Sequence, residues 1–386
     1  MFTHLQVEHF KSLADVHITL GNVTVFVGRN SVGKSNVIEA LIFLRDCLDR
    51  GIDSATSDRF GIDSILQWSR FRPYKLLIRI DFRDGPYVGH YSLRISSRKK
   101  QPVILSESGS WRARDNKESV SFEREGQDVR TFGFPQDIQK LISAQGIDDD
   151  ETVISRLRYI AGHTSGINRL YRTITSTQSY SIYPNVVRDP QKPSREPMLT
   201  HSGDNITSIL KSMVSSKSAR VRRSYSEILS TMKMIIPNLE RILVRNLSGF
   251  LWLNFEVSES DGKSHQLNTT QISDGALRIL GILVAIYQPN PPRLIAIEEP
   301  EQNLHPGALG LLADAFRDRS EGAQLILTTH SPHLIDHFDA NDIRTVETRD
   351  GVSQIGRISE YHRKTIKDGL MSAGELMLTQ GLIREG

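Results

Sequence analysis

The sequence has little of several features that mark special classes of protein. Cys47 is the one cysteine in 386 residues, so neither an intrachain disulfide nor a multi-cysteine zinc site can form. A low cysteine content is typical of a reducing cytoplasm. The longest apolar stretch, residues 279–287, is far shorter than the roughly 18 residues that a membrane-spanning helix needs. Residues 1–5 show no basic and apolar regions of a signal peptide. We therefore expect a cytoplasmic protein without a membrane partner.

A large charge of one sign is also missing. Lys and Arg number 48 against 45 Asp and Glu, which gives a net charge of +3. This surplus does not indicate a protein that coats nucleic acid, although local basic patches remain possible. Sustained heptads are absent, which excludes a coiled-coil rod. The apolar fraction of 38% and the 27 glycines are ordinary for globular proteins and exclude a wholly disordered or collagen-like chain.

The first part of the chain predicts strands followed by a helix. Residues 2–10 and 16–20 are typical of two short strands, and the apolar, β-branched residues 23–27 predict a strand that is buried on both faces. Helical spacing of apolar residues follows Lys34 and ends at Gly51, a plausible C-terminal cap. Weak alternation between turn signals predicts further antiparallel strands, and the best of these are 75–82 and 88–95.

The rest of the chain predicts a helical middle and a second region of alternating strands and helices. Residues 136–176 and 202–236 have helical patterns, whereas four prolines within 183–197 predict a loop. Residues 243–257 are strand-like again. A helix (273–287), a buried strand (294–297), a helix (306–319) and a buried strand (325–328) then follow in turn. Buried strands that alternate with helices predict a parallel sheet with crossover helices.

Residues 28–35 carry a phosphate-binding motif. Their sequence, Gly-Arg-Asn-Ser-Val-Gly-Lys-Ser, fits G-x-x-x-x-G-K-[ST] at every defined position. Glycines allow the backbone to curl so that several N–H groups point at one anion, and the helix that follows adds its positive N-terminal end. Lys34 would reach the β- and γ-phosphates, and the Ser35 hydroxyl would ligate Mg²⁺. Because the motif follows a buried strand and opens a helix, it predicts nucleotide binding.

Polar residues at the ends of the two later buried strands complete such a site. Glu298 and Glu299 follow directly after one strand, where the first would hold the metal ion and the second would polarise the attacking water. His330 follows the other strand, on the rim where open α/β sheets bind ligands. Its imidazole can donate a hydrogen bond to a γ-phosphate oxygen, which favours a phosphate-sensing role.

A further anion site is predicted at the start of the helix 273–287. Ser273 or Asp274 caps this helix and Gly275 lies in its first turn, and a helix N-terminus of this kind can bind an anion. Ser273 lies 239 residues after Lys34 and 25 residues before Glu298. A large insertion therefore separates the two halves of the nucleotide site.

Together, these motifs resemble those of a known family. Their order, with the Glu-Glu-Pro-Glu run at 298–301, Leu-His-Pro at 304–306 and Thr-His-Ser-Pro at 329–332, is similar to the ABC-type ATPases of the RecF, SMC and OLD group. More narrowly, it resembles the stand-alone AAA-family ATPases of prokaryotic genomes. Segments 7–13, 199–206 and 374–378 resemble further elements of that group.

The resemblance implies roles for individual residues. Lys34 and Ser35 resemble the Walker A pair, Glu298 the Walker B acid, Glu299 the catalytic glutamate and His330 the switch histidine. Ser273 to Gly275 resembles the signature motif, which in this group completes the site of the opposite subunit in a head-to-tail dimer, with residues 303–306 near that interface. The implied cofactors are ATP and Mg²⁺. Implied nucleotide-binding residues are Gly28, Arg29, Asn30, Ser31, Val32, Gly33, Lys34, Ser35, Asn36, Ser273, Asp274 and Gly275; the implied catalytic residues are Lys34, Glu299 and His330; and the implied metal ligands are Ser35 and Glu298.

The sequence departs from the family pattern at three points. Arg29 stands where the family more often has a small residue or proline, and Glu298 stands where aspartate is more usual. The longer side chain of Glu298 alters the expected geometry at the metal. A glutamine of the family's Q-loop has no clear counterpart, although Gln67 is one candidate.

The resemblance also implies a fold and a division of the chain. We expect an α/β ABC-type head with a mixed sheet, N-terminal antiparallel strands and a helical insertion. Its halves would be 1–135 and 241–348, with a helical arm at 136–240 and a tail at 349–386 that packs on the head. Neither the Toprim domain of OLD nucleases nor the coiled coil of SMC proteins has a counterpart in the sequence.

Three functions remain open on the sequence. The first is an ATPase subunit of a prokaryotic anti-phage defence system, active as a dimer or higher oligomer, that controls a separately encoded nuclease or toxin. The second is a RecF-like DNA-repair ATPase that contacts DNA. The third, a nucleotide-switched scaffold with little turnover, is disfavoured by the presence of both Glu299 and His330. Two groups of basic residues could contact DNA: Lys211, Lys217, Arg220, Arg222 and Arg223, and Arg98, Lys99, Lys100, Arg112 and Arg114.

Overall fold

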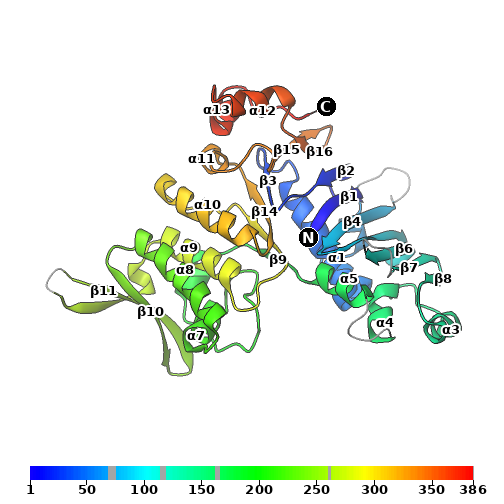
Figure 1. Cartoon of the computed structure of the whole chain (residues 1–386), viewed down its shortest axis with the longest axis horizontal. Coiled ribbons are helices and arrows are strands. Elements are labelled where there is room, and N and C mark those ends of the chain that lie inside the picture. Colours follow the sequence, from blue (N-terminus) through cyan, green and yellow to red (C-terminus); the bar gives the residue numbers. More distant parts are fainter. Residues whose placement is uncertain (68–74, 114–118, 161–165, 260–261, 386) are drawn as a thin grey trace. The chain divides into compact units, whose positions relative to one another are not determined.

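The chain folds into two compact units, which Figure 1 shows in a computed structural model. The structure describes residues 1–67, 75–113, 119–160, 166–259 and 262–385. One unit comprises Met1–Thr177, Ile343–Arg363 and Leu382–Gly386, and the other comprises Gln178–Asp342 and Lys364–Gly381. Each unit thus combines segments that are far apart in the sequence. Among the helices of the described ranges, none has both the length and the apolar character that a membrane crossing requires.

An antiparallel sheet occupies much of the first unit (Figure 1). Its strand order is β2-β1-β4-β5-β6-β7-β8, and each neighbouring pair is antiparallel. The strands are β1 (Phe2–Phe10), β2 (Leu13–Thr19), β4 (Leu76–Asp84), β5 (Tyr87–Arg98), β6 (Gln101–Ala113), β7 (Ser119–Glu125) and β8 (Asp128–Phe132). The antiparallel strands expected at 75–82 and 88–95 are therefore confirmed as β4 and β5.

The nucleotide motif of this unit follows a short, fully buried strand. In β3 (Val23–Val27) every residue is buried, as its β-branched and apolar composition predicts. β3 is parallel to β15 (Ile343–Arg349), which pairs antiparallel with β16 (Val352–Arg357). The helix α1 (Lys34–Arg50) begins at the end of the motif and stops before Gly51, whose φ of 83° ends the helix as expected.

Four shorter helices also belong to the first unit: α2 (Ile52–Ser57), α3 (Gln136–Gln145), α4 (Val153–Ile160) and α5 (Gly166–Thr175), with a 3₁₀ turn at Ile62–Ser64. α2, α4 and α5 contact α1, whereas α3 contacts β8. The predicted helical character of 136–176 is confirmed by three of these helices. Ile167, Leu170 and Ile174 of α5 are buried, and α5 contacts α1. The helix α12 (Glu360–Lys367) spans the boundary between the two units in the sequence.

The second unit contains the second predicted set of buried strands. β13 (Leu294–Glu298) and β14 (Gln324–Thr329) are parallel, with Glu298 opposite Thr328, and β9 (Thr177–Tyr180) follows β13 in the strand order. The helix α9 (Asp274–Tyr287) is buried continuously from Ala276 to Tyr287. The other helices are α7 (Ile206–Ser215), α8 (Ala219–Ile235), α10 (Pro306–Ser320), α11 (Pro332–Ile335) and α13 (Ala373–Thr379). The parallel strands and crossover helix expected here are confirmed.

A small antiparallel sheet also belongs to the second unit. Its strands β10 (Leu239–Leu247), β11 (Phe250–Ser258) and β12 (Ser264–Asn268) are consecutive in the chain. Ser248 and Gly249, with φ of 52° and 83°, form the turn between β10 and β11. The strand-like stretch predicted at 243–257 is thus two strands of a hairpin, because left-handed residues interrupt it. A 3₁₀ turn, Thr269–Gln271, leads from β12 towards α9.

The loop predicted at 183–197 is partly wrong. Its first residues form the short helix α6 (Pro184–Arg188). Pro184 occupies the first turn of that helix, where its missing N–H would have no partner in any case and its fixed φ suits the helix. The prolines at 190, 193 and 197 do follow a non-helical path. Position within the helix, rather than the number of prolines, decides the outcome.

Candidate functional site

The phosphate-binding loop of the first unit contains two glycines at which an added Cβ would clash with neighbouring atoms. A Cβ at Gly28 would lie 2.2 Å from the carbonyl oxygen of Val346, and one at Gly33 would lie 2.1 Å from Ser353 Oγ. Gly33 also has a φ of 101°, and Ser31, with a φ of 64°, adopts a left-handed conformation as well. These dihedral angles give the loop the curvature that the motif predicts.

Lys34 folds back over this loop. The residue is only 5% exposed, and its Nζ donates hydrogen bonds of 2.8 Å to the carbonyl oxygens of both Gly28 and Arg29. Ser35 in the first turn of α1 is exposed, as are Arg29, Asn30 and Ser31 in the loop. No side chain among the described residues caps the start of α1. The ammonium group thus stays within the loop, and the first turn of the helix is accessible at its surface.

The hydroxyl groups of Ser12 and Ser353 stabilise the phosphate-binding loop through hydrogen bonds. Ser353 Oγ donates to the carbonyl oxygen of Val32 at 2.6 Å and lies 2.6 Å from Ser12 Oγ. Asn36, a predicted nucleotide-binding residue, donates from Nδ2 to Ser12 Oγ at 2.7 Å. The sequence gives no signal for Ser353, which lies 321 residues after Val32. Ser12 lies in a segment that resembled the family, but no role could be assigned to it from the sequence.

Glu298 and Glu299 lie where β13 ends in the second unit. Glu298 is the last residue of the strand and Glu299 is the first residue of the turn, and both are half-buried. Glu299 has a φ of 44°, which is left-handed for a residue other than glycine and typically costs about 1–3 kcal/mol. Its backbone N–H donates to the carbonyl oxygen of Thr328 at 2.9 Å, which ties the turn to β14.

His330 meets the catalytic glutamate candidate at the end of β14. Its Nδ1 lies 3.4 Å from Glu299 Oε1, and its side chain is 43% exposed. These two residues come from the ends of neighbouring parallel strands, at the edge where open α/β sheets bind ligands. The predicted catalytic acid and the predicted γ-phosphate sensor therefore lie close together within the second unit.

Glu301 also belongs to this cluster, although the sequence assigned it no role. Its Oε1 accepts hydrogen bonds from Thr329 Oγ1 at 2.6 Å and from the backbone N–H of His330 at 3.1 Å. The same oxygen lies 3.6 Å from His330 Nδ1, and the carboxylate is only 7% exposed. Glu301 thereby fixes the backbone from which His330 extends. Gln302 donates a hydrogen bond from its side chain to Glu299 Oε2.

The predicted anion site at the start of α9 has the expected cap. Ser273 Oγ accepts a hydrogen bond of 3.3 Å from the backbone N–H of Ala276. Gly275 approaches the chain closely after β13, because a Cβ there would lie 2.7 Å from the carbonyl oxygen of Asn303. Arg188 of α6 forms an ion pair with Asp274 and donates to the carbonyl oxygens that precede the helix.

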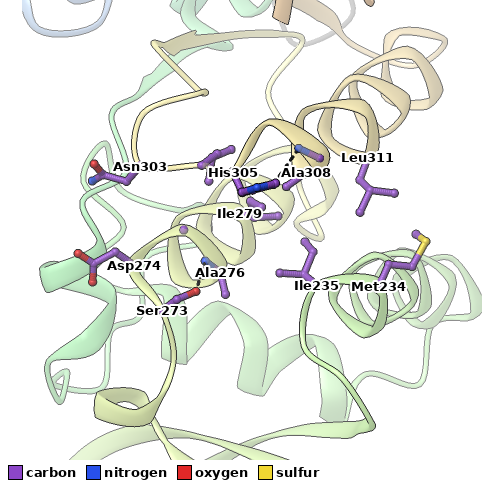
Figure 2. A pocket seen from close by; sticks show the side chains of 13 residues that line it. Met234, Ile235, Ser273, Asp274, Ala276, Ile279, Asn303, His305, Ala308 and Leu311 are labelled. Atoms are coloured by element: carbon purple, nitrogen blue, oxygen red, sulfur yellow. Dashed lines mark hydrogen bonds between the residues drawn. The ribbon is translucent and has the colours of Figure 1, made fainter. Parts of the chain in front are cut away.

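A pocket of about 620 Å³ lies beside this helix start, and Figure 2 shows it from close by. Asp274 and Asn303 lie on one side of it, whereas Met234 and Leu311 lie on the other. His305 caps α10 through Nδ1, which accepts from the N–H of Gly307 at 3.1 Å. The N-terminal ends of α9 and α10 therefore border the same pocket, with apolar side chains of α8 and α10 opposite.

The structure also places the remaining candidates. Gln67, the Q-loop candidate, has its Oε1 2.9 Å from His9 Nδ1 in the first unit. The side chains of one basic group (Lys211, Lys217, Arg220, Arg222 and Arg223) are exposed in the second unit, and those of Arg98, Lys99, Lys100 and Arg112 are exposed in the first. Arg114 lies outside the described residues. Within the described part, no group of three or more His, Cys, Asp or Glu side chains could hold a metal ion by itself.

Comparison with known proteins gives one family match and one curated relative. Residues 23–336 match the AAA_21 family, whose description reads "AAA domain, putative AbiEii toxin, Type IV TA system". The DNA replication and repair protein RecF of Paenarthrobacter aurescens (strain TC1) is 33% identical over 113 residues. That match spans 29% of this chain and 26% of RecF, so it covers about a quarter of the relative's length.

Solved structures of SMC head domains share the fold. The head bound to the C-winged helix domain of ScpA matches with a TM-score of 0.54 at 16% identity, over 94% of this chain and 99% of that one. The head from Pyrococcus furiosus, with an extended coiled coil and bound to the C-terminal domain of ScpA, matches with a TM-score of 0.50 at 13% identity, over 96% and 99%. At these identities the likeness concerns the fold alone.

The comparisons confirm two predictions from the sequence. The fold is that of an α/β ATPase head of the SMC and ABC kind, with an antiparallel N-terminal sheet and a mixed sheet. The resemblance to the group that contains RecF and SMC proteins is confirmed as well. Because the family match extends over residues 23–336, the chain belongs to the AAA_21 family of P-loop ATPase domains, which implies that it binds ATP.

Proposed function

We propose that the protein hydrolyses ATP with Mg²⁺ as a head-to-tail dimer, and that it thereby controls a separately encoded effector in a prokaryotic anti-phage defence system. The observation that carries the hydrolytic part is the distance of 3.4 Å between Glu299 Oε1 and His330 Nδ1. A P-loop ATPase needs a group that activates water beside a group that reaches the γ-phosphate. The pair at the ends of β13 and β14 is suited to these two tasks.

Each site residue has a chemical task in this proposal. Glu299 accepts a proton from water as the water oxygen bonds to the γ-phosphorus, and the bond from that phosphorus to the β–γ bridging oxygen breaks to leave ADP. His330 donates a hydrogen bond to a γ-phosphate oxygen and holds it in place. Lys34 leaves the carbonyl oxygens of Gly28 and Arg29 to neutralise the β- and γ-phosphates. The amides of the loop and of the first turn of α1 bind the same phosphates.

The donor chemistry of the site fits Mg²⁺. Ser35, which is exposed, offers a hydroxyl oxygen, and Glu298, which is half-buried, offers a carboxylate oxygen. Mg²⁺ prefers hard oxygen ligands and typically takes only one or two from the protein, because phosphate oxygens and waters supply the rest. Ser35 and Glu298 would hold the ion, which would neutralise charge on the β- and γ-phosphates when bound.

The pocket beside α9 supports the dimeric part of the proposal. Exposed Ser273 and Asp274 border it at a helix N-terminus, which favours negative charge. In the proposed dimer, this end of α9 meets the γ-phosphate of ATP that is bound to the P-loop of the other subunit. Control of an effector is supported by the description of the matched family, which names a toxin and a toxin–antitoxin system.

Phosphate release and ATP binding, measured with purified full-length protein, test the hydrolytic proposal. We expect Lys34→Ala to lose ATP binding, because the charge over the loop disappears. We expect Glu299→Gln to bind ATP normally but to hydrolyse it about 100-fold or more slowly, since general-base catalysis typically contributes 10²–10⁴-fold. Glu321→Gln, which alters an exposed acid of the same unit, serves as the matched control. Normal hydrolysis by Glu299→Gln would contradict the assignment.

Purification of the protein from its host tests the proposal that it controls an effector. A nuclease or toxin encoded beside the gene should co-purify with the wild-type protein, and the amount recovered should differ between the ATP-bound Glu299→Gln and the ATP-free Lys34→Ala variants. An effector that co-purifies equally with both variants would contradict control by the nucleotide.

A RecF-like role on DNA is a second candidate. Two observations favour it: the partial match to RecF, and the five exposed cations within residues 211–223, a stretch that contains no acidic residue. Neutralising these cations with glutamine should weaken duplex DNA binding and flatten its salt dependence if they contact phosphates. Salt-sensitive DNA binding together with DNA-stimulated hydrolysis, and no co-purifying effector, would favour this role over the defence role.

A further inference from the structure

Arg278 is a buried cation inside an otherwise apolar helix. Its residue is 3% exposed, and the rest of α9 from Ala276 to Tyr287 consists of apolar residues that are also buried. Burial lowers the pKa of Arg278, and the nearby charges of Glu301, Tyr183 and Glu299 oppose that change. Packing alone would favour leucine or methionine at this position, because burying a guanidinium is costly unless its donors find acceptors. The acceptors of Arg278 therefore indicate what it does.

The guanidinium connects three segments of the second unit. Its Nη1 donates to the carbonyl oxygen of Ile182 at 2.6 Å. Its Nη2 donates to the carbonyl oxygen of Glu299 at 2.9 Å and reaches that of Glu298 at 3.4 Å. Nε is buried and has no hydrogen-bond partner among the described residues. The hydrogen bonds thus fall on the backbone of the two predicted site acids rather than on their carboxylates.

The backbone conformation of Glu299, whose carbonyl oxygen accepts from Arg278, must be stabilised by neighbouring groups. Its left-handed φ of 44° is unfavourable for a glutamate, and such a conformation persists only where neighbouring groups enforce it. Thr328 holds the N–H side of this residue through its carbonyl oxygen at 2.9 Å, and Arg278 holds the carbonyl side. Since backbone conformation sets the direction of the side chain, these two bonds together aim the Glu299 carboxylate.

The other end of the connection is the start of α9. Arg278 lies five residues after Ser273, or about 7.5 Å along the helix axis. A helix that is buried around its whole circumference moves as a rigid element when a ligand contacts its N-terminal end. A small displacement there would therefore change the hydrogen bonds that Arg278 makes to Glu299.

We propose that Arg278 is a positioning residue that couples the Ser273 end of α9 to Glu299 of the same chain. Contact of that end with a partner subunit's nucleotide is thereby communicated to the water-activating group of the chain's own site. This inference rests on the proposed hydrolytic function. It predicts that Arg278 acts on the chemical step and leaves ATP affinity unchanged.

Steady-state hydrolysis and binding of a fluorescent ATP analogue, measured on the full chain, test the proposal. Arg278→Met keeps the volume and removes the donors, and we expect kcat to fall at least 30-fold while KM and Kd stay within threefold. Arg278→Lys should fall between this variant and the wild type, because an ammonium cannot reproduce the fork of a guanidinium. Arg319→Met is the matched control, because Arg319 Nε on α10 is also buried and has no hydrogen-bond partner in the described part of the chain. The kcat of this variant should stay within twofold of the wild type.

A double-mutant cycle separates positioning from a general effect on structure. In the Glu299→Gln background, Arg278→Met should cause no further loss in single-turnover hydrolysis, because the group on which it acts is already absent. An additive loss, or a change in Kd with an unchanged kcat, would overturn the proposal. If Arg278→Met does not fold, the same measurements on Arg278→Lys test the positioning role instead. Failure of both to fold, while Arg319→Met folds, would overturn it in favour of a packing role.

A wild-type protein that hydrolyses no ATP would refute the proposed function, and the positioning role would then be read from amide hydrogen exchange. The N–H of Glu299 bonds to Thr328 and that of Gln302 bonds to Glu299. Both amides should exchange at least tenfold faster in Arg278→Met than in Arg319→Met. Equal exchange in the two variants would overturn the inference independently of activity.

Discussion

Glu107 is a buried carboxyl group of the first unit that lies outside the nucleotide motifs. It is 1% exposed, and its Oε2 accepts from the backbone N–H of Val153 at 2.6 Å. Its Oε1 accepts from the N–H of Ile154 at 3.1 Å and from Tyr91 Oη at 3.0 Å. Burial raises the pKa of Glu107 to about 7 in spite of these hydrogen bonds. Residues of β5, β6 and the start of α4 thus meet at one titratable group.

The raised pKa predicts that stability falls as the pH rises. The unfolded chain loses this proton near pH 4.5, whereas the folded protein keeps it until about pH 7, so ionisation favours the unfolded state between these values. The group therefore removes up to about 3 kcal/mol of unfolding free energy across this window. Urea unfolding at pH 4.5 and 7.5 should show this decrease in the wild type and a smaller one in Glu107→Gln. Equal pH dependence in both proteins would contradict the prediction.

At Gly28, the addition of a single methyl group is expected to lower both the unfolding free energy and the affinity for ATP. Its Cβ position lies 2.2 Å from a backbone carbonyl oxygen, that of Val346, which cannot rotate away as a side chain can. We expect Gly28→Ala to lower the unfolding free energy by about 2 kcal/mol or more, and to weaken ATP binding. Gly310→Ala is the control, since its nearest neighbour, a side-chain atom of His337, is 3.5 Å away and alanine favours helices. Equal unfolding free energies for the two variants would contradict this account.

At the scale of secondary structure, the sequence predicts the elements whose signals are local. The strand Val23–Val27, the helix that begins at Lys34 and the strand ending at Glu298 each follow from apolar composition, glycine or a terminal acid within a short window. The same locality explains why the catalytic acid and histidine candidates could be selected. Each follows its own buried strand, and parallel neighbours bring such ends to one edge.

The sequence does not predict contacts between distant segments. Ser353 supports the phosphate-binding loop from 321 residues away, and no periodicity or motif marks it. Glu301 was visible within a run of acids, but only the structure shows that it accepts from Thr329 and His330. The sequence does not predict helix α6, because the number of prolines does not say where in a helix turn each proline falls. Its last residue, Arg188, then proved to hold the start of α9.

The contacts of Arg188, the last residue of α6, indicate that α6 stabilises the start of α9. It donates to the carbonyl oxygens of Thr269 at 2.5 Å and Ile272 at 3.2 Å, and Thr269 Oγ1 donates back to its carbonyl oxygen at 2.7 Å. We expect Arg188→Ala to lower the unfolding free energy by about 1–3 kcal/mol, because carbonyl oxygens lose a charged donor. It should also speed amide exchange in the first turn of α9.

Asp274→Ala provides the comparison for this prediction. It removes only the ion pair with Arg188, in which the acid side chain is 61% exposed, so the change in unfolding free energy should stay below about 1 kcal/mol. An effect as large as that of Arg188→Ala would mean that the ion pair, rather than the bonds to the backbone, holds the helix start. Thermal and urea unfolding of the two variants distinguish these alternatives.

At the scale of the whole molecule, the phosphate-binding loop and the start of α9 share one property: both favour negative charge and can bind phosphate. The loop would hold the nucleotide from one side with amides and an ammonium, and α9 offers a second helix N-terminus beside a pocket of about 620 Å³. Two copies in head-to-tail arrangement would let each site use both parts. The slight net charge of +3 sets no strong barrier to such self-association.

The dimer itself is the prediction at this scale. Glu299→Gln should bind ATP and hydrolyse it only slowly, so sedimentation with Mg²⁺ and ATP should reveal a species of twice the monomer mass. Glu299→Gln combined with Lys34→Ala should stay monomeric because it binds no nucleotide. Glu299→Gln combined with Ser273→Arg should bind ATP but stay monomeric, since the larger side chain fills the helix start that the partner's phosphate must approach. A dimer of equal abundance without ATP, or one that survives Ser273→Arg, would contradict the arrangement.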